Sequence, residues 1–325
     1  MRNICIITTC TKKKIATPYA YLSSSNKFEN LSDLATYWKN LIFNCPLHKK
    51  IPASELYRGR GFKRALRIVD EDASRVEIIS AGLGFVKATD RLPPYNLTTS
   101  VGASSHVKNH ITLGRFDPVE WWSKISNRRI SETIESRPDD LFVIACSRAY
   151  LEMIMDDLLS LTEEARSRIR IVGNDLEQIS DYELFDYIMP YDLRLNSIDS
   201  PYAGSKIDFA QRAAHHLVKE VIIKNPDGTP KEHQQAVFAS MESFGSLEDA
   251  VRNHSIPNED LRILLLKEWN NAFGRLTRLL GLVRQKYGFS CSENRLKLVM
   301  DEIKADMARG IPVFDEIEED EEEAA

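Results

Sequence analysis

Four short apolar runs constrain the fold of this chain more than any other feature. Each has the length of a buried strand and is rich in β-branched residues, and helical spacing of apolar residues fills the longer segments between them. The runs are Ile4–Ile7, Val76–Ile79, Leu141–Cys146 and Ile169–Val172. Buried strands that alternate with helices predict a doubly wound α/β fold with a mainly parallel sheet.

Polar loops follow three of these runs, where each strand ends. The first, Thr8–Lys14, is rich in hydroxyls and lysines; the second contains the glycine turn Ala81–Gly84; the third is Ser147–Tyr150. The carboxyl ends of parallel strands share one edge of a sheet, where such folds bind ligands. We therefore expect a functional site at this edge. Its lysines suit an anion, and a solvated lysine cluster is the alternative.

A segment rich in helix breakers, residues 225–230, predicts a domain boundary. Beyond it the pattern is helical: one long helix is expected from Asn258 to Val283 and another is capped by Ser292, which resembles a helix-turn-helix. The alternative is a helical appendage that packs on the first domain or on a partner. The predicted parts are an α/β domain (1–225), a helical domain (226–312) and an acidic disordered tail (313–325).

Charge and cysteine usage limit the classes of function. The segment Asp315–Glu323 holds eight acids, and without it the formal charge of −5 becomes +3, so the body is mildly basic. The five cysteines lack metal-ligand or disulfide spacing, which predicts reduced thiols, no metal site and a cytoplasmic location. No apolar run reaches the length of a membrane span, and no cofactor is expected.

The most basic stretch is Ser54–Val69, whose apolar residues have the spacing of an amphipathic helix. Its polar face carries five cations and invites contact with a polyanion, although a solvated face is the alternative. These cations are Arg58, Arg60, Lys63, Arg64 and Arg67.

Common nucleotide-binding and hydrolase motifs are absent: the sequence has no Walker A motif, dinucleotide fingerprint, nucleophile elbow or zinc signature. The order Ser80-Ala81-Gly82-Leu83-Gly84, then Asp90, then Pro94-Tyr95-Asn96-Leu97 resembles the central motif of the YaaA-like proteins. Weaker similarities in the same order are Thr8–Lys13, Glu55–Gly59 and Val143–Tyr150, so the resemblance covers roughly residues 1–220, discontinuously.

This resemblance implies DNA binding and an α/β core similar to the uracil-DNA glycosylase superfamily. One phage-defence branch resembles DNA glycosylases that attack modified cytosines. The chain departs from the glycosylase pattern in two loops, because Thr9-Cys10-Thr11-Lys12 replaces Gly-Gln-Asp-Pro-Tyr and Cys146-Ser147-Arg148 replaces His-Pro-Ser. The catalytic residues of that superfamily therefore have no direct counterpart here.

The leading hypothesis is a glycosylase that flips a modified base out of double-stranded DNA and excises it for anti-phage defence. Asp90 is the expected carboxylate, because an oxocarbenium-like sugar needs a negative charge nearby; capping of its own turn is the alternative role. Asn96 and Ser80 complete the predicted catalytic set. Predicted base contacts are Thr9, Cys10, Tyr95, Ser147 and Tyr150, and predicted DNA-backbone contacts are Lys12, Lys13, Arg58, Arg60, Lys63, Arg64 and Arg148.

Two other classes of function stay open at this point. One is a binding protein that coats or distorts DNA without chemistry, and the other is recognition of an RNA base. A Schiff base on Lys12 or Lys13 is also conceivable, but none is expected because the three adjacent lysines 12–14 should all be exposed.

Overall fold

The protein divides into two compact units. The computed structural model describes residues 3–100, 102–179, 182–197, 200–246, 257–287, 289, 291–311 and 313. The first unit comprises Met1–Leu195 and Gly204–Ser243, and the second comprises Asn196–Ala203 and Phe244–Ala325. The predicted boundary at residue 225 lies inside the first unit, because helix α9 (Pro230–Ser243) packs on that unit. Except for Val313, the predicted acidic tail lies outside the described residues.

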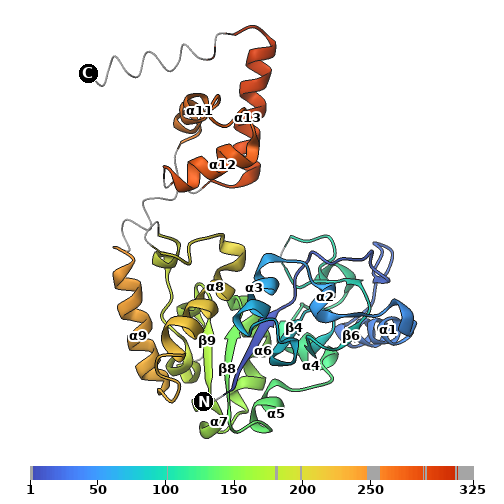
Figure 1. Ribbon diagram of the computed structural model, residues 1–325. Helices are drawn as coiled ribbons and strands as arrows, with labels where there is room; N and C mark the ends of the chain where they lie inside the picture. Colours follow the sequence, from blue (N-terminus) through green and yellow to red (C-terminus); the bar gives the residue numbers. More distant parts are fainter. Residues whose placement is uncertain are drawn as a thin grey trace. The chain divides into compact units, whose positions relative to one another are not determined.

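A five-stranded sheet forms the centre of the first unit (Figure 1). Its order is β5-β4-β1-β8-β9; β4, β1, β8 and β9 run parallel, and β5 is antiparallel to β4. The four predicted apolar runs are the four parallel strands, which confirms a mixed α/β fold. The strands are β1 (Asn3–Thr9), β4 (Val76–Ser80), β5 (Gly84–Lys87), β8 (Asp140–Ala145) and β9 (Ile169–Val172).

The edge strand β5 is not among the predicted strands. The chain reverses through the turn after Ser80, and Gly84 takes a φ of +73°, a conformation that favours glycine. Only Phe85 and Val86 are apolar in this strand, so it is too short for period-two alternation to reveal it. Two smaller pairings lie beside the sheet: β2 (Ala20–Tyr21) with β7 (Tyr95–Asn96), and β3 (Ile51–Pro52) with β6 (Arg91–Leu92).

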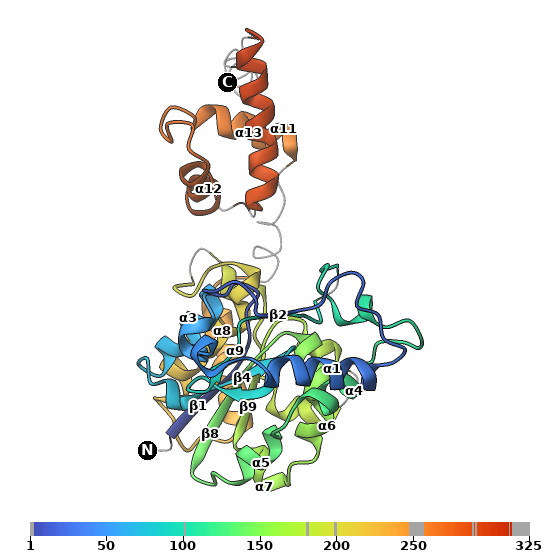
Figure 2. The ribbon, with the colours of Figure 1, turned by 90° about the vertical axis from the view of Figure 1, so that its right-hand side faces the viewer.

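Helices cover both faces of the sheet, as Figure 2 shows from the side. On one face α3 and α8 pack on β1, β8 and β9; on the other lie α6 and its neighbours α4 and α5. The helices of the first unit are α1 (Leu31–Phe43), α2 (Ala53–Leu56), α3 (Arg60–Ile68), α4 (Pro118–Ile125), α5 (Ile130–Glu135), α6 (Arg148–Leu159), α7 (Glu163–Ser167), α8 (Phe209–His216) and α9.

Strand residues alternate between the two apolar cores. Cys5 and Ile7 of β1 belong to the core under α4, α5 and α6, whereas Thr8 faces α8 and accepts a hydrogen bond from the Gln211 amide at 3.0 Å. This alternation fixes the register of β1, because a shift by one residue would exchange the two faces.

Two predicted helices are interrupted in the structure. Ser54–Val69 contains α2 and α3, separated at Tyr57–Gly59, where the backbone is extended and pairs with Lys14. The expected long helix from Asn258 is two helices, because Phe273 and Gly274 take positive φ values of +54° and +58°.

In its described residues, the second unit has three helices around their own core of buried aliphatic residues, which includes Leu265, Leu279 and Leu296. Ser292 caps the last helix by accepting a hydrogen bond from the amide of Arg295, as predicted. The helices are α11 (Asn258–Lys267), α12 (Leu276–Gln285) and α13 (Glu293–Ala308). In the described part of the chain, no helix has the length and apolar character needed to cross a membrane.

Candidate functional site

Three strand-end loops meet at the carboxyl edge of the sheet, as the sequence predicts. The backbone amide of Cys10, which follows β1, donates to the carbonyl of Ile79 in β4 at 3.0 Å. The Cys10 Sγ also lies 3.5 Å from the hydroxyl of Tyr150, in the first turn of α6 after β8. Residues 10, 80 and 150 are thus brought together from three separate parts of the chain.

Three buried hydroxyls form the floor of this site. The Tyr95 Oη lies 2.7 Å from the Ser80 Oγ and 3.0 Å from the Tyr57 Oη, and all three side chains are almost fully buried. The Ser80 Oγ additionally accepts a hydrogen bond from the amide of Leu83 at 3.1 Å. Each hydroxyl therefore has a defined partner, which holds the network in one arrangement.

The glycine turn after β4 makes room for Tyr95. A Cβ atom on Gly82 would lie 2.6 Å from the Tyr95 ring, so only glycine permits this approach. Two indole groups hold the turn: Trp38 Nε1 donates to the carbonyl of Gly82 at 2.5 Å, and Trp121 Nε1 donates to that of Ala81 at 2.8 Å.

Burial keeps the phenols of this site protonated. It raises the pKa of Tyr57 and of Tyr95, and the proximity of Cys10 raises the pKa of Tyr95 further. Burial and Cys10 have the same effect on the pKa of Tyr150. These hydroxyls are hydrogen-bond donors across the physiological pH range.

Lys14 extends over the floor. Its ammonium lies 4.0 Å from the centre of the Tyr95 ring and 5.6 Å from that of Tyr57, and Nζ donates to the carbonyl of Thr11 at 3.2 Å. Unlike Lys12 and Lys13, which are exposed, Lys14 is half-buried, so the prediction of three exposed lysines is wrong for this one. We call the assembled group the strand-end cluster: Cys10, Lys14, Tyr57, Ser80, Tyr95 and Tyr150.

Exposed cations lie on the two segments that carry Lys14 and Tyr57, the loop after β1 and the stretch that leads into α3. The Arg58 amide donates to the carbonyl of Lys13 at 2.9 Å, and the Gly59 amide donates to the Thr11 hydroxyl at 3.3 Å. These contacts place the start of α3 beside the loop after β1. The exposed cations of this region are Lys12, Lys13, Arg58, Arg60 and Lys63.

Two other predicted DNA-backbone residues, Arg64 and Arg148, are engaged within the protein, and so is Arg67 of the basic stretch. Arg64 is half-buried, 3.5 Å from the Nδ1 of His215, and Arg67 pairs with Glu71 at 3.9 Å. Arg148 donates to Glu152 and to Gln178, both at 2.8 Å. The basic face of α3 is therefore narrower than its sequence predicts, with the free cations at its amino-terminal end.

Asp90 lies at the other end of β4. The Ala88 amide donates to the carbonyl of Val76, at the start of β4, and the Asp90 carboxylate accepts from the Lys87 amide at 2.7 Å. Ser80 lies at the opposite end of β4, about 13 Å from Val76 at 3.3 Å per residue. In the structure the Asp90 carboxylate caps its own turn, and a catalytic role for Asp90 stays a prediction.

The other predicted site residues lie around the cluster without joining its hydrogen bonds. Asn96 is exposed and follows Tyr95 in β7, so its side chain points to the opposite face. Thr9 ends β1 and is half-buried, while Ser147 is exposed before α6. Lys14 and Tyr57 were missing from the predicted site, because their pairing across residues 14 and 57 has no local sequence signal.

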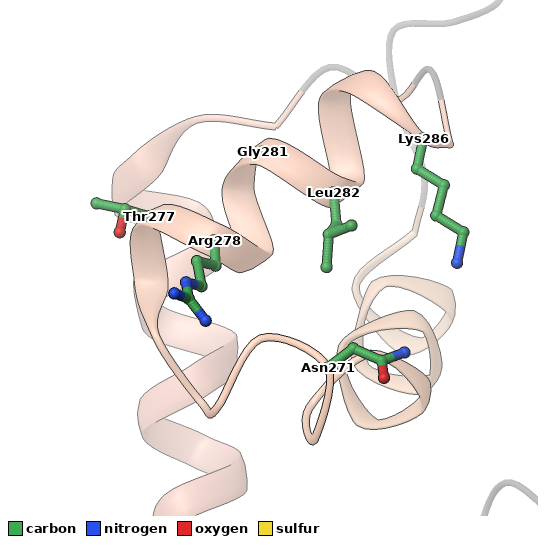
Figure 3. Close-up of a pocket in the computed structure, with 6 residues that line it drawn as sticks. All are labelled: Asn271, Thr277, Arg278, Gly281, Leu282 and Lys286. Atoms are coloured by element: carbon green, nitrogen blue, oxygen red, sulfur yellow. The ribbon is translucent and has the colours of Figure 1, made fainter.

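Metal-binding groups do not gather in this structure: the described residues contain no set of three or more His, Cys, Asp or Glu side chains able to hold an ion. The second unit contains a separate cavity of about 640 Å3 along α12 (Figure 3). Arg278 and Lys286 lie toward its two ends, and Asn271 reaches toward it from the preceding turn. Lys286 also pairs with Glu268.

Comparison with known proteins supplies one match. The model of a family of unknown function (DUF6884) matches residues 45–178, which include Tyr57, Ser80, Tyr95 and Tyr150 but not the loop after β1. No curated protein and no solved structure matches the chain.

Proposed function

We propose that this protein is a DNA glycosylase that takes a modified base into the strand-end cluster and cleaves its bond to deoxyribose. The observation that carries the proposal is the cluster itself: the thiol of Cys10, the amine of Lys14 and the phenol of Tyr150, from two strand-end loops, converge on the hydroxyl network of Ser80, Tyr57 and Tyr95, beside exposed cations. In the reaction, the C1′–N bond breaks, water adds to C1′, and the base leaves with a proton.

Different parts of the site would bind the DNA backbone and the flipped base. The exposed Lys12, Lys13, Arg58 and Arg60 would hold phosphates and position the duplex without reading its sequence. Cys10 and Tyr150, both half-buried, would meet the flipped base, and the buried hydroxyls below would supply donors to the departing base.

The resemblance to YaaA-like proteins supports the same proposal. Its central motif contains Ser80 and Tyr95, which are part of the floor of the cluster. The motif also contains the glycine turn, which leaves room for the Tyr95 ring. We accordingly propose a uracil-DNA-glycosylase-like core, a role in phage defence through modified cytosine, a helix-turn-helix-like use of the second unit, and a cytoplasmic location, in keeping with five free cysteines.

A second candidate, DNA binding without chemistry, is favoured by a different observation. Among the described residues, no carboxylate forms a hydrogen bond or ion pair with a member of the strand-end cluster, and Asp90 is occupied in its own turn. A hydrolytic glycosylase uses a carboxylate to stabilise the sugar cation or to activate water. A protein that only binds DNA needs the exposed cations that contact phosphates, but it needs no catalytic carboxylate.

Alkali treatment separates the two candidates. The protein is incubated with duplexes that carry cytosine or cytosine with 5-substituents of increasing size, and then each duplex is heated in alkali. The glycosylase proposal predicts strand breaks only at the modified positions. Binding in a mobility shift without any alkali-labile break would overturn it in favour of the binding protein.

Reversing the charge of two exposed cations beside the cluster, Arg60→Glu with Lys63→Glu, should weaken binding to all duplexes alike. Each lost phosphate contact should also reduce the log-log salt slope of the affinity by about 0.9. The control is Lys224→Glu with Lys231→Glu, an equal charge change on exposed residues outside α3 and the loop after β1. An unchanged slope in the α3 variant would move the phosphate contacts elsewhere, with Arg278 of the second unit the next candidate.

A further inference from the structure

Lys14 has surroundings unlike those of the lysines beside it. The loop after β1 pairs with the segment between α2 and α3, through an isolated bridge between Lys14 and Tyr57 and the Ile15 amide on the carbonyl of Leu56 at 2.9 Å. This pairing turns Lys14 inward over Tyr95 while Lys12 and Lys13 face solvent. The inward position is a property of the fold and not of the lysine run.

Among the residues that the structure describes, no acid neutralises this amine. Its polar contacts are the carbonyl of Thr11 and the faces of two tyrosine rings, and within the described residues no carboxylate lies in ion-pair distance of its Nζ. Lys286 shows the contrast, because its ammonium is held by the carboxylate of Glu268. A carbonyl and aromatic faces stabilise an ammonium less than a carboxylate does.

The physical consequence is a larger fraction of neutral amine. Burial lowers the pKa of Lys14, and the neighbouring Cys10 opposes that shift only in part. The titratable groups that face it are Cys10, Tyr57 and Tyr95, and the two phenols stay protonated and uncharged. A neutral amine is a nucleophile, and burial is one of the ways in which proteins activate lysine.

We infer that Lys14 is an amine nucleophile that forms a Schiff base with the aldehyde of an abasic deoxyribose held at the strand-end cluster. The inference rests on the proposed function for its substrate, since an abasic site is what base excision leaves. It replaces the earlier candidates, Lys12 and Lys13, with the one lysine of the run that lies over the cluster.

The step is balanced without any resident cofactor. The lone pair of Lys14 Nζ adds to C1′ of the ring-opened sugar, the two protons of the amine pass in turn to the former aldehyde oxygen, and that oxygen leaves as water as the C=N bond forms. Cyanoborohydride added in the experiment delivers hydride to C1′ and a proton from water adds to nitrogen, which turns the imine into a stable secondary amine between protein and DNA.

The experiment uses the full chain and a duplex with a preformed abasic site, in the presence of cyanoborohydride. Wild-type protein should give a covalent complex that resists denaturing electrophoresis, and peptide mass spectrometry should place the adduct on Lys14. Lys14→Arg keeps the positive charge but removes the nucleophile, so trapping should fall at least tenfold. Lys87→Arg, the same change at an exposed lysine of β5, should trap as wild type.

A second readout comes from pH. The neutral fraction of an ordinary lysine falls about a hundredfold from pH 9 to pH 7, and so should trapping by a lysine-containing peptide. Trapping by the protein should fall less steeply. Equal trapping by Lys14→Arg, an adduct that maps to Lys12, Lys13 or Cys10, or no adduct above that given by an unrelated protein would each overturn the inference.

The inference and the proposed function fail in different ways. Because the abasic site is made beforehand, trapping on Lys14 does not depend on base excision. Trapping without alkali-labile breaks at modified bases would keep Lys14 as an abasic-site nucleophile and reject the glycosylase. Base release without trapping would keep a hydrolytic glycosylase and reject the role of Lys14. Urea unfolding of Lys14→Arg checks that its fold is intact.

Discussion

Arg170→Met is expected to lower the free energy of unfolding of the first unit by about 1–3 kcal/mol for each buried acceptor that it leaves unsatisfied. Arg170 lies in β9 and is completely buried. Its guanidinium donates to Nδ1 of His233 at 2.8 Å, to the carbonyl of Gly228 at 2.7 Å, and to the carbonyls of Ser167 and Ile169 at 2.8 Å. Methionine has similar length but leaves these acceptors without their donor.

The same variant tests where the first unit ends. Since Gly228 and His233 belong to the turn before α9 and to α9 itself, losing Arg170 should increase hydrogen exchange in α9 more than in α1. Arg67→Met is the matched control, because that side chain is 71% exposed and its pair with Glu71 should contribute less than about 1 kcal/mol. A stability within 1 kcal/mol of wild type for Arg170→Met would contradict the account.

Acid should destabilise the first unit well before its carboxylates titrate. Burial lowers the pKa of His216 to about 4, and its Nδ1 lies 2.7 Å from the hydroxyl of Tyr191. An unfolded chain binds this proton near pH 6.5 and the folded one does not, so stability is present above pH 6.5 and is lost as pH falls toward 4. Between pH 7 and pH 5 this one group should remove about 2 kcal/mol.

Urea unfolding at several pH values measures this loss. The pKa values of three further histidines are also lowered, first by burial, so the total slope should exceed that of one group; they are His106, His215 and His233. His216→Gln should flatten the slope whatever it does to stability at pH 7, whereas His48→Gln, at an exposed position, should leave the slope unchanged. A slope that is the same in both variants would refute the assignment to His216.

The sequence predicts the parallel strands and the edge at which they meet. Runs such as Ile4–Ile7 and Leu141–Cys146 are apolar on both faces, as a strand covered by helices on both sides must be, and that pattern is local. The convergence of Cys10, Ser80 and Tyr150 then follows from the parallel direction of the strands.

Features that depend on contacts between distant segments are the ones that the sequence leaves out. In the sequence nothing distinguishes Lys14 from Lys12 and Lys13. Its inward position depends on the pairing with Tyr57, a residue far away in the chain. Asp90 follows Ser80 closely in sequence, yet the hairpin of β4 and β5 carries it to the far end of the strand. Tyr95 and Asn96 are adjacent, but strand alternation places them on opposite faces.

The central claim of the proposed function is that a base is cleaved at the strand-end cluster, and the catalytic role that the sequence predicts for Asp90 is the competing expectation. Release of free modified base from duplex DNA, measured by mass spectrometry for wild type, Tyr95→Phe and Asp90→Asn, tests it most directly. Loss of the Tyr95 hydroxyl, a donor in the floor, should reduce the rate about a hundredfold. Asp90→Asn keeps an oxygen that can accept from the Lys87 amide, and its rate should stay within about threefold of wild type. Abolished release in Asp90→Asn with normal release in Tyr95→Phe, both variants folded, would contradict the claim.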